Sequence, residues 1–344
     1  MTVVPYLLQD ILIVIAFFWK PDRLPILVWQ LNGFMKYSSF SNITIVVTTN
    51  KPENLAFACK HYSMDCSKVE IWDSILVKNN PLDLTFEHRI VIENKLKFKN
   101  YTAYMYTEDD HMITPQALVS WAIDTELLEP FGFTRGFLRS EYCGDGQQRL
   151  IDFDNPFVSL TNGRPKVDRL YKNTTNGVNF EGLLYRMSDK YGSELCPSTS
   201  DHDGSVIYTP CPIHAHFFSP FYPYQAMWTL SHTQLQTFMK HDIWNVTYCQ
   251  TYTNPLQPWP TREKAASYNL FVNIPYGFDS NSVIPFYHIH NKNRLSRLGT
   301  SYHLSANYCY KNHRDHSYIY PANHTYIIHK NHPYFENNSS YNTG

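Results

Sequence analysis

The stretch YTAYMYT at Tyr101–Thr107, followed without a break by EDD at Glu108–Asp110, decides the fold of this chain. Seven mostly apolar or β-favouring residues predict a buried strand, and three carboxylates stand where that strand ends. Pro115 then opens a helix that we expect to run to Leu128, with Thr114 as its N-cap. A buried strand that leads through a short acidic turn into a helix is typical of a parallel α/β sheet.

The segments before this strand alternate in the same way. We expect, in chain order, strand Ile11–Phe18, helix Arg23–Tyr37, strand Ile43–Thr49, helix Pro52–His61, strand Lys68–Asp73 and helix Thr85–Leu96. Asp83 is the expected N-cap of the last helix, and Glu87 adds capping-box character to it. This order predicts an α/β fold, with a Rossmann-related, mostly parallel sheet flanked by helices.

The alternation breaks down in the second half of the chain. Asn-Gly and Asp-Gly pairs and several prolines between 134 and 219 favour hairpins and long loops. Further helices are expected at Ser231–Lys240, capped by Ser231, and at Thr261–Ser267. We therefore divide the chain into a first half at 1–145, an irregular α+β half of the same domain at 146–300, and an irregular C-terminal tail at 301–344.

Composition excludes several classes of protein. Hydrophobic residues make up 43% of the 344 residues and charged residues 17%, which predicts a globular chain. The formal net charge of −1 provides no global attraction to a polyanion, so we expect no nucleic-acid partner. The sequence has no G-x-G-x-x-G, P-loop, H-E-x-x-H or G-x-S-x-G motif, so dinucleotide, P-loop, zincin and serine-hydrolase chemistry are not indicated.

The apolar run near the start of the chain is predicted to be a strand. Asp10 interrupts Val3–Trp19, and the uninterrupted part, Ile11–Trp19, has nine residues. A bilayer span needs about 20 apolar residues, and no basic region precedes this run. We therefore expect no membrane span within the chain.

Cysteines and glycosylation sequons bear on the compartment. None of the seven cysteines forms a C-x-x-C pair, and the odd number leaves at least one thiol free. N-x-[ST] sequons start at Asn42, Asn100, Asn173, Asn245, Asn323, Asn337 and Asn338. They fit a glycoprotein of the Golgi or ER lumen, but the chain is also rich enough in Asn, Ser and Thr to contain them by chance. A secretory protein would need a targeting segment upstream of Met1, so the sequence leaves the lumen and the cytoplasm both open.

The acidic triplet is the clearest chemical feature. In open parallel sheets, ligands bind outside the carboxyl ends of the strands. If the segment stays extended, Glu108 and Asp110 point to one side and Asp109 to the other. Two carboxylates on one side suit Mn²⁺ or Mg²⁺ when the phosphates of an activated donor complete the coordination shell. The structural alternative is a solvated acidic turn that favours the positive end of the next helix.

The chain also resembles the family of GT-A glycosyltransferases, which use nucleotide sugars and a D-x-D-like metal motif at a strand end. The segments that carry the resemblance are Leu84–His88 with Tyr104–Asp110, Pro223–Trp228, Arg262–Ser267 and His288–Asn291. Thr107 and Glu108 depart from the family pattern, which more often has an apolar residue and an Asp at these positions. The resemblance for that reason favours Asp110 over Glu108 as a direct metal ligand.

The resemblance implies roles for further residues. A late histidine, His288 or His290, would complete the metal shell, and Glu263 or Glu141 would serve as the general base. Asp109, Arg139 and Arg262 are implied to contact the nucleotide. Asp22 and Arg23 are candidates for the same contact, because the loop after the first strand faces the same crevice. The residues implied to line the acceptor side are Tyr224, Gln225 and Trp228. Each has a plain structural alternative: a surface histidine, a helix N-terminal glutamate or a core tryptophan.

The leading hypothesis is therefore a metal-dependent glycosyltransferase of the hexosyl or pentosyl class. It would move a sugar from a nucleotide-diphosphate sugar, bound by the half at 1–145, to a hydroxyl of a glycan, glycoprotein or glycolipid bound by the half at 146–300. One alternative is a metal-dependent phosphoesterase or nucleotide-sugar hydrolase, in which water replaces the acceptor. Another is a catalytically inactive carbohydrate-binding protein on a transferase fold.

Overall fold

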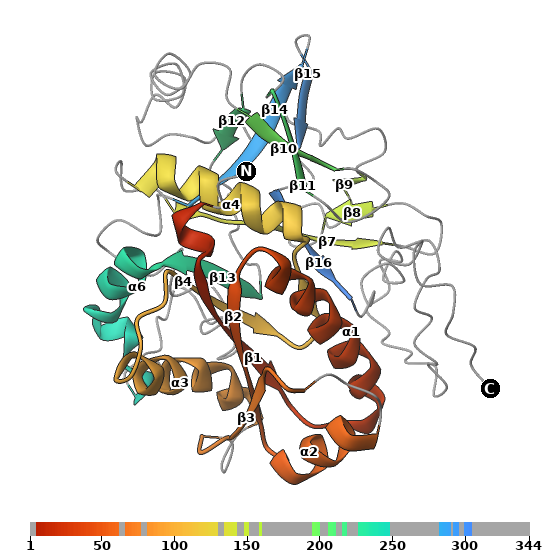
Figure 1. Cartoon of the computed structure of the whole chain (residues 1–344), viewed down its shortest axis with the longest axis vertical. Helices are drawn as coiled ribbons and strands as arrows, with labels where there is room; N and C mark the ends of the chain where they lie inside the picture. The colour runs from red at the N-terminus through yellow and green to blue at the C-terminus, as the bar shows by residue number, and fades with distance from the viewer. Residues whose placement is uncertain are drawn as a thin grey trace, which may run out of the picture.

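A five-stranded sheet forms the centre of the structure, in the order β13-β4-β1-β2-β3 (Figure 1). Its strands are β1 (Asp10–Phe17), β2 (Asn42–Thr49), β3 (Val69–Asp73), β4 (Ala103–Glu108) and β13 (Met227–Ser231). The first four are parallel to one another, and β13 runs antiparallel to β4. The prediction of a mostly parallel sheet is therefore confirmed. The computed structural model describes residues 5–61, 66–76, 81–129, 134–142, 148–150, 158–159, 195–199, 206–210, 215–218, 226–247, 282–289, 292–295 and 299–304.

Helices cover both faces of this sheet. On one face, α1 (Leu24–Met35), α2 (Pro52–His61) and α4 (Pro115–Leu128) pack against Ile11, Ile13 and Ile15 of β1. On the other face, α3 (Glu87–Leu96) and α6 (His232–Met239) pack against Leu12 and Val14. Ile11–Phe17 of β1 are buried on both sides for this reason, which accounts for the uninterrupted apolar sequence after Asp10. Each fully buried Ile, Leu or Val side chain contributes about 2 kcal/mol to folding.

Most of the predicted elements of the first half are confirmed. α2 and α4 have the predicted bounds, and the Thr114 hydroxyl accepts a hydrogen bond from the Ala117 amide at the start of α4. Ser231 and Gln234 form a capping box at the start of α6. The helix expected at 261–267 lies outside the described residues.

The predicted capping of α3 is wrong. Pro81–Phe86 forms a 3-10 helix, so Asp83 lies within it, and the N-cap of α3 is Phe86, whose side chain makes no cap hydrogen bond. Glu87 is the first residue of α3. Its carboxylate is buried and bonds to the segment that follows β3, rather than to the N-terminus of its own helix.

A second sheet adjoins the first, in the order β5-β16-β7-β8-β9. Its strands are β5 (His111–Met112), β16 (Thr300–His303), β7 (Leu138–Tyr142), β8 (Gln148–Leu150) and β9 (Val158–Ser159). β16 pairs antiparallel with β5 and parallel with β7. The first residues of the predicted irregular tail therefore belong to a strand.

Shorter strands complete the described part of the second half. β12 (Ala215–Phe218), β14 (Ser282–Ile289) and β15 (Lys292–Leu295) form an antiparallel sheet, and β6 (Thr134–Arg135) pairs with β14. β10 (Leu195–Thr199) and β11 (Val206–Pro210) form an antiparallel pair. These strands fit the irregular α+β character expected after residue 134.

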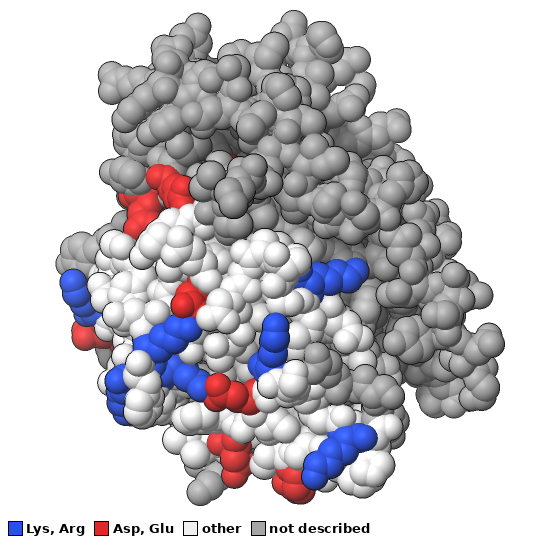
Figure 2. Space-filling model, in the orientation of Figure 1, with Lys and Arg blue, Asp and Glu red and all other residues white. Residues whose placement is uncertain are grey.

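The described surface shows charges of both signs. On the face in Figure 2, basic and acidic side chains lie interspersed over the described residues. Among the helices of the described ranges, none has both the length and the apolar composition that a membrane crossing requires.

Candidate metal and nucleotide site

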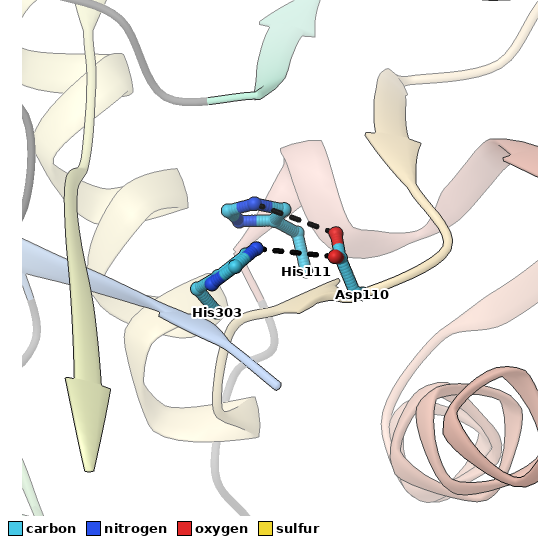
Figure 3. A group of neighbouring side chains, drawn as sticks. All are labelled: Asp110, His111 and His303. Atoms are coloured by element: carbon cyan, nitrogen blue, oxygen red, sulfur yellow. Dashed lines mark ion pairs between the residues drawn. The ribbon is translucent and has the colours of Figure 1, made fainter. Parts of the chain in front are cut away.

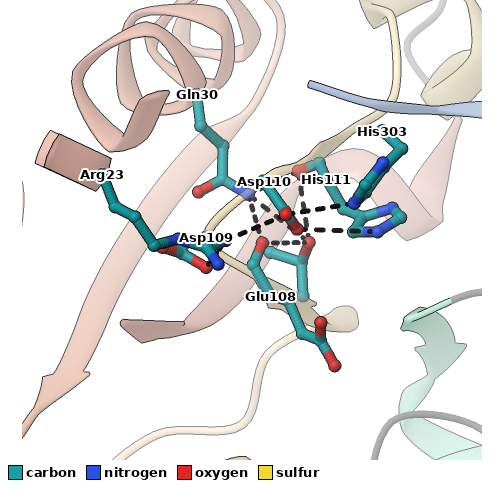
Figure 4. Close-up of polar contacts among 8 residues, drawn as sticks. Arg23, Gln30, Glu108, Asp109, Asp110, His111 and His303 are labelled. Atoms are coloured by element: carbon teal, nitrogen blue, oxygen red, sulfur yellow. Dashed lines mark hydrogen bonds and ion pairs between the residues drawn. The ribbon is translucent and has the colours of Figure 1, made fainter. Parts of the chain in front are cut away.

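The candidate site lies where the chain order of the central sheet reverses. The chain runs outward from β1 through β2 to β3 and then returns to the other side of β1 as β4. A crevice forms at such a switch point, outside the carboxyl ends of the two strands. β1 leads there into the short 3-10 helix Pro21–Arg23, and β4 leads into Asp109 and Asp110. Figure 4 shows Arg23 and the acidic turn facing each other across this point.

Arg23 binds two of the three carboxylates. Its Nε and Nη2 each lie 2.7 Å from one oxygen of Asp109, and Nη2 lies 2.9 Å from Asp110 Oδ2. Both Asp side chains are almost fully buried, whereas about a quarter of the Arg23 side chain is exposed, at 28%. The bidentate geometry is the strong form of an arginine–carboxylate pair.

This acidic turn carries more negative charge than Arg23 neutralises. Burial, opposed by Arg23 and reinforced by the Asp110 and Glu108 carboxylates, raises the pKa of Asp109 to about 8. Burial would also raise the pKa of Asp110, but His303 and Arg23 outweigh it and hold that pKa well below its usual range. A further cation would relieve the crowding of these carboxylates.

Two histidines meet Asp110 (Figure 3), and they lie on the side of it away from Arg23 (Figure 4). His303 Nε2 lies 3.1 Å from Asp110 Oδ2, and His111 Nε2 lies 3.6 Å from Asp110 Oδ1. All three residues are buried, and one potential ligand atom from each lies within 4.8 Å of the others. His303 comes from β16, which is docked by its pairing with β5 and by a 2.7 Å bond from the Leu304 amide to the Asp110 carbonyl. The pairing of β5 and β16 thus brings His303 close to Asp110 and His111, which lie almost 200 positions earlier in the sequence.

His111 has the chemistry of a metal ligand. Its ring is fully buried, and neither ring nitrogen has a hydrogen-bond partner within the described residues. Burial, reinforced by His303 and opposed by Asp110, lowers its pKa well below the usual value. The imidazole is therefore neutral at pH 7, with a lone pair available to a cation. A buried polar group without a partner is costly, which a ligand would offset.

The donor set of this group fits a divalent cation. One carboxylate and two imidazoles are typical ligands of Mn²⁺, Fe²⁺ and Zn²⁺, whereas Mg²⁺ prefers oxygen ligands alone. Of the two ions that the sequence predicted, the side chains of Asp110, His111 and His303 therefore suit Mn²⁺ better.

Side chains of α1 and β4 bind the backbone of the acidic turn. Gln30 of α1 is buried, and its Nε2 donates to the Glu108 carbonyl at 2.7 Å and to the His111 carbonyl. The Thr107 hydroxyl lies 3.0 and 3.2 Å from the same two oxygens. These contacts close the turn between residues 108 and 111 and fix the positions from which Asp110 and His111 project (Figure 4).

The predicted alternation of the triplet is wrong. β4 ends at Glu108, and Asp109 and Asp110 form a turn, so the two-residue period of a strand does not continue through them. Asp109 and Asp110 consequently share Arg23, and the Glu108 carboxylate points away from the histidines in Figure 4. Glu108 is not part of the buried group that the described residues form around Asp110.

Other predicted residues occupy varied places. Arg139 is buried on β7 opposite Ser301 of β16, and its charge contributes to the lowered pKa of His111. Trp228 is buried in the core on β13, beside Tyr106 of β4. Asp22 is exposed in the 3-10 helix after β1.

The remaining predicted residues are described in part or not at all. His288 lies on β14 opposite Asn293, and Glu141 lies on β7 opposite Arg149, but their side chains are outside the described part. The predicted residues that lie wholly outside it are Tyr224, Gln225, Arg262, Glu263 and His290.

Sequence reasoning missed His111, His303 and Gln30. His111 directly follows the acidic triplet, so its adjacency was an available signal. His303 is one of 16 histidines and reaches Asp110 only through strand pairing. Gln30 lies among apolar residues on α1, where a buried amide has no local signature.

The chain was also compared with known proteins. No family model and no curated protein matches it. Among solved structures it is similar to S. aureus TarS, at 8% identity and a TM-score of 0.32, over 75% of this chain and 33% of that one. It is similar to the inositol-1-phosphate CTP transferase from T. maritima, at 11% identity and a TM-score of 0.23, over 44% of this chain and 63% of that one. It is also similar to the glycosyltransferase GlyE of Streptococcus pneumoniae TIGR4, at 14% identity and a TM-score of 0.21, over 54% of this chain and 44% of that one.

The chain thus spans about a third of the length of TarS, at 33%. With TM-scores below 0.5 and identities of 8% to 14%, these likenesses carry no conclusion about this chain.

Proposed function

We propose that this protein is a metal-dependent glycosyltransferase that moves a sugar from a nucleotide-diphosphate sugar to a hydroxyl acceptor. The observation that carries the proposal is the buried group of Asp110, His111 and His303 beside Arg23, at the switch point of a parallel sheet. Sheets of this kind bind ligands at that point, and this one places there three side chains that could hold a metal ion, together with Arg23.

Asp110, His111 and His303 would hold the ion, and Mn²⁺ suits their donor atoms. When bound, the ion would supply positive charge against the negative charge that develops on a departing diphosphate. Arg23 is the chain's own cation at this place, and its guanidinium could turn from Asp109 to a phosphate oxygen. Asp22, Asp109, Arg139 and Arg262 remain proposed contributors to the nucleotide side of the site.

The acceptor side of the proposal rests on the sequence. Glu263 or Glu141 would accept the proton of the acceptor hydroxyl, and its oxygen would form a bond to the anomeric carbon as the bond to the diphosphate breaks. Tyr224 and Gln225 would line this side, and Trp228, which is buried, remains a proposed part of it. His288, His290 and Glu108 remain proposed as further ligands.

Calorimetric titration with UDP and GDP, with and without Mn²⁺, tests the proposal. We expect nucleotide binding that requires Mn²⁺ and that weakens at least tenfold, about 1.4 kcal/mol, in Asp110→Ala. Asp73→Ala is the matched control, because Asp73 is an exposed carboxylate at the carboxyl end of β3, the edge strand of the same sheet. Nucleotide binding with the same affinity with and without Mn²⁺, and in the wild type and Asp110→Ala, would contradict the proposal.

Two imidazoles in the buried group also favour a second candidate, the nucleotide-sugar hydrolase. Hydrolytic metal sites commonly combine His and Asp ligands, and His303 adds a ligand from a second sheet. Incubation with UDP- and GDP-sugars in the absence of an acceptor separates the two. Stoichiometric release of free sugar at the same rate with and without an acceptor would assign the hydrolase, and acceptor-dependent turnover would assign the transferase.

A further inference from the structure

Three glycosylation sequons lie within the described residues, and all three asparagines are exposed. They are Asn42, Asn100 and Asn245, each followed by Thr two positions later. Ile43 and Tyr101, which follow the first two asparagines, are buried, so the chain comes to the surface at the asparagine in each case. The exposure leaves room for a bulky, hydrophilic glycan on each of them.

Asn100 lies at the opposite edge of the sheet from the candidate site. It precedes β4 at the amino edge, where the parallel strands begin, whereas Asp110 follows β4 at the carboxyl edge. The eight residues from Asn100 to Glu108 separate the two edges by roughly 25 Å at the rise of an extended chain. A glycan at Asn100 would therefore leave the crevice at the switch point open.

Asn245 lies on a firmly held part of the surface. It directly follows the 3-10 helix Asp242–Trp244, and its own backbone is extended, with φ −66° and ψ 120°. Arg89 of α3 donates to the Ile243 carbonyl, and Trp244 Nε1 donates to Glu93 at 2.7 Å. These bonds anchor the residues before the sequon, so the exposed Asn245 projects from a fixed position.

The side chain of Asn42 is held by a hydrogen bond within the fold. Its Nδ2 donates to Asp10 Oδ1 at 2.8 Å, and Lys99 binds the same oxygen at 2.6 Å. The amide that would carry a glycan thus already links the first residues of β1 and β2. For this reason the inference concerns Asn100 and Asn245.

A disulfide independently indicates the secretory lumen, the compartment in which N-linked glycans are added. Cys59 of α2 is bonded to Cys66, which precedes β3, and their Cα atoms are 5.8 Å apart. Disulfides form and persist in the secretory lumen and are rare in the cytosol, where thiols are kept reduced. N-linked glycans are added in that same lumen.

We propose that, when this chain folds in an oxidising secretory lumen, Cys59 and Cys66 are joined and Asn100 and Asn245 carry N-linked glycans. Glycan transfer forms a bond from asparagine Nδ2 to the anomeric carbon of a lipid-diphosphate oligosaccharide. The bond from that carbon to the diphosphate breaks, and the amide proton leaves with the diphosphate. In disulfide formation, the two thiols pass two electrons and two protons to the disulfide of a protein oxidant, which becomes a dithiol.

The test is to express the full chain behind a cleavable secretory signal in eukaryotic cells and map its modifications. The folded, protease-resistant product is alkylated without reduction, released from its glycans by an amidase in heavy-oxygen water, and analysed by peptide mass spectrometry. We expect heavy-oxygen aspartate at positions 100 and 245 in most molecules, and a linked peptide pair for Cys59 and Cys66. Unmodified Asn100 and Asn245, or alkylated Cys59 and Cys66, in that folded product would overturn the proposal.

Single substitutions provide a second readout that does not depend on peptide recovery. Asn100→Gln and Asn245→Gln should each remove the mass of one glycan from the secreted chain. Asn94→Gln is the matched control, because Asn94 lies near Asn100 but outside any sequon, and it should leave the mass unchanged. Loss of no mass in either sequon variant would overturn the proposal. The outcome is independent of the proposed transferase activity, because it concerns neither Asp110 nor nucleotide binding.

Discussion

Glu87 and Asp110 are both buried carboxylates near the carboxyl edge of the central sheet, but the protein completes the hydrogen bonding of only one of them. The Glu87 carboxylate accepts four hydrogen bonds, from Trp72 Nε1, Ser74 Oγ and the amides of Ile75 and Leu76, at 2.8 to 3.2 Å. Asp110 Oδ2 meets Arg23 and His303, whereas Oδ1 has no hydrogen bond within the described residues.

The difference separates a structural carboxylate from a binding one. The four donors around Glu87 tie the segment after β3 to the start of α3, and no coordination position is left for a ligand. Asp110 instead faces a buried, neutral imidazole whose nitrogens also lack hydrogen bonds within the described residues. The following substitutions should therefore affect stability at the first carboxylate and cation binding at the second.

The largest expected effect on stability is that of Glu87→Ala. It leaves four donors without their charged acceptor, so we expect the free energy of unfolding to fall by about 3 kcal/mol. Urea unfolding measures this loss, and Mn²⁺ affinity of the folded variant should be unchanged. Glu53→Ala, at an exposed acidic position in the first turn of α2, should cost less than about 1 kcal/mol. A Glu87→Ala loss as small as that of the control would show that the two carboxylates do not differ in this way.

Gln30→Met should weaken cation binding at Asp110 indirectly, because Gln30 holds the backbone of the turn that carries Asp110. Met is close to Gln in size but cannot donate to the Glu108 and His111 carbonyls, so the turn that carries Asp110 and His111 would loosen. Loss of such supporting contacts typically weakens metal binding 10- to 100-fold, and we expect about tenfold for Mn²⁺. Fluorescence competition with a metal indicator measures it. Thr107→Ser, which keeps the hydroxyl beside the same carbonyls, is the control and should bind Mn²⁺ like the wild type.

The sequence predicts the elements around both carboxylates better than it predicts their roles. α2 and α4 follow from local signals, namely apolar periodicity, prolines in the first turn and the Thr114 cap, which act within one helix. Glu87 was assigned to a helix cap by its position in the sequence. Its actual partners belong to the segment after β3, which tertiary packing alone brings close.

The candidate site shows the same limit. Asp110 and Arg23 follow from the rule that ligands bind at the carboxyl ends of parallel strands. The directions of the three carboxylates could not be predicted, because β4 ends at Glu108 and the alternation of a strand does not extend to Asp109 and Asp110. A late histidine was expected from the family resemblance, but His303 depends on the antiparallel pairing of β16 with β5, which no local pattern in the His-rich tail reveals.

Gly33→Ala tests the close packing beneath the histidines. A Cβ at this position of α1 would overlap Met112 Sδ on β5, next to His111. We expect a loss of about 1 to 2 kcal/mol in the free energy of unfolding, together with weaker Mn²⁺ binding. Adding Met112→Ala removes the overlap, so the double variant should recover most of the Mn²⁺ affinity. Equal affinity in the wild type and in Gly33→Ala would indicate that β5 does not transmit the shift to His111.

Arg23→Gln should have the smallest effect on Mn²⁺ affinity, and it should raise that affinity rather than lower it. It removes a positive charge 2.9 Å from Asp110, so Mn²⁺ alone should bind about fivefold more tightly, close to 1 kcal/mol of reduced charge repulsion. The same titration with Arg23→Lys, which keeps the charge, should match the wild type. Weaker Mn²⁺ binding in Arg23→Gln would mean that Arg23 organises the carboxylates for the ion rather than competing with it.

The most direct test of the central claim is the binding of Mn²⁺ itself, followed by electron paramagnetic resonance of the free ion. We predict one ion per chain in the wild type, affinity at least tenfold lower in Asp110→Asn and in His111→Gln, and no change in Asp73→Asn. Failure of the wild type to bind Mn²⁺, or wild-type affinity in Asp110→Asn, would contradict the assignment of Asp110, His111 and His303 as a metal site.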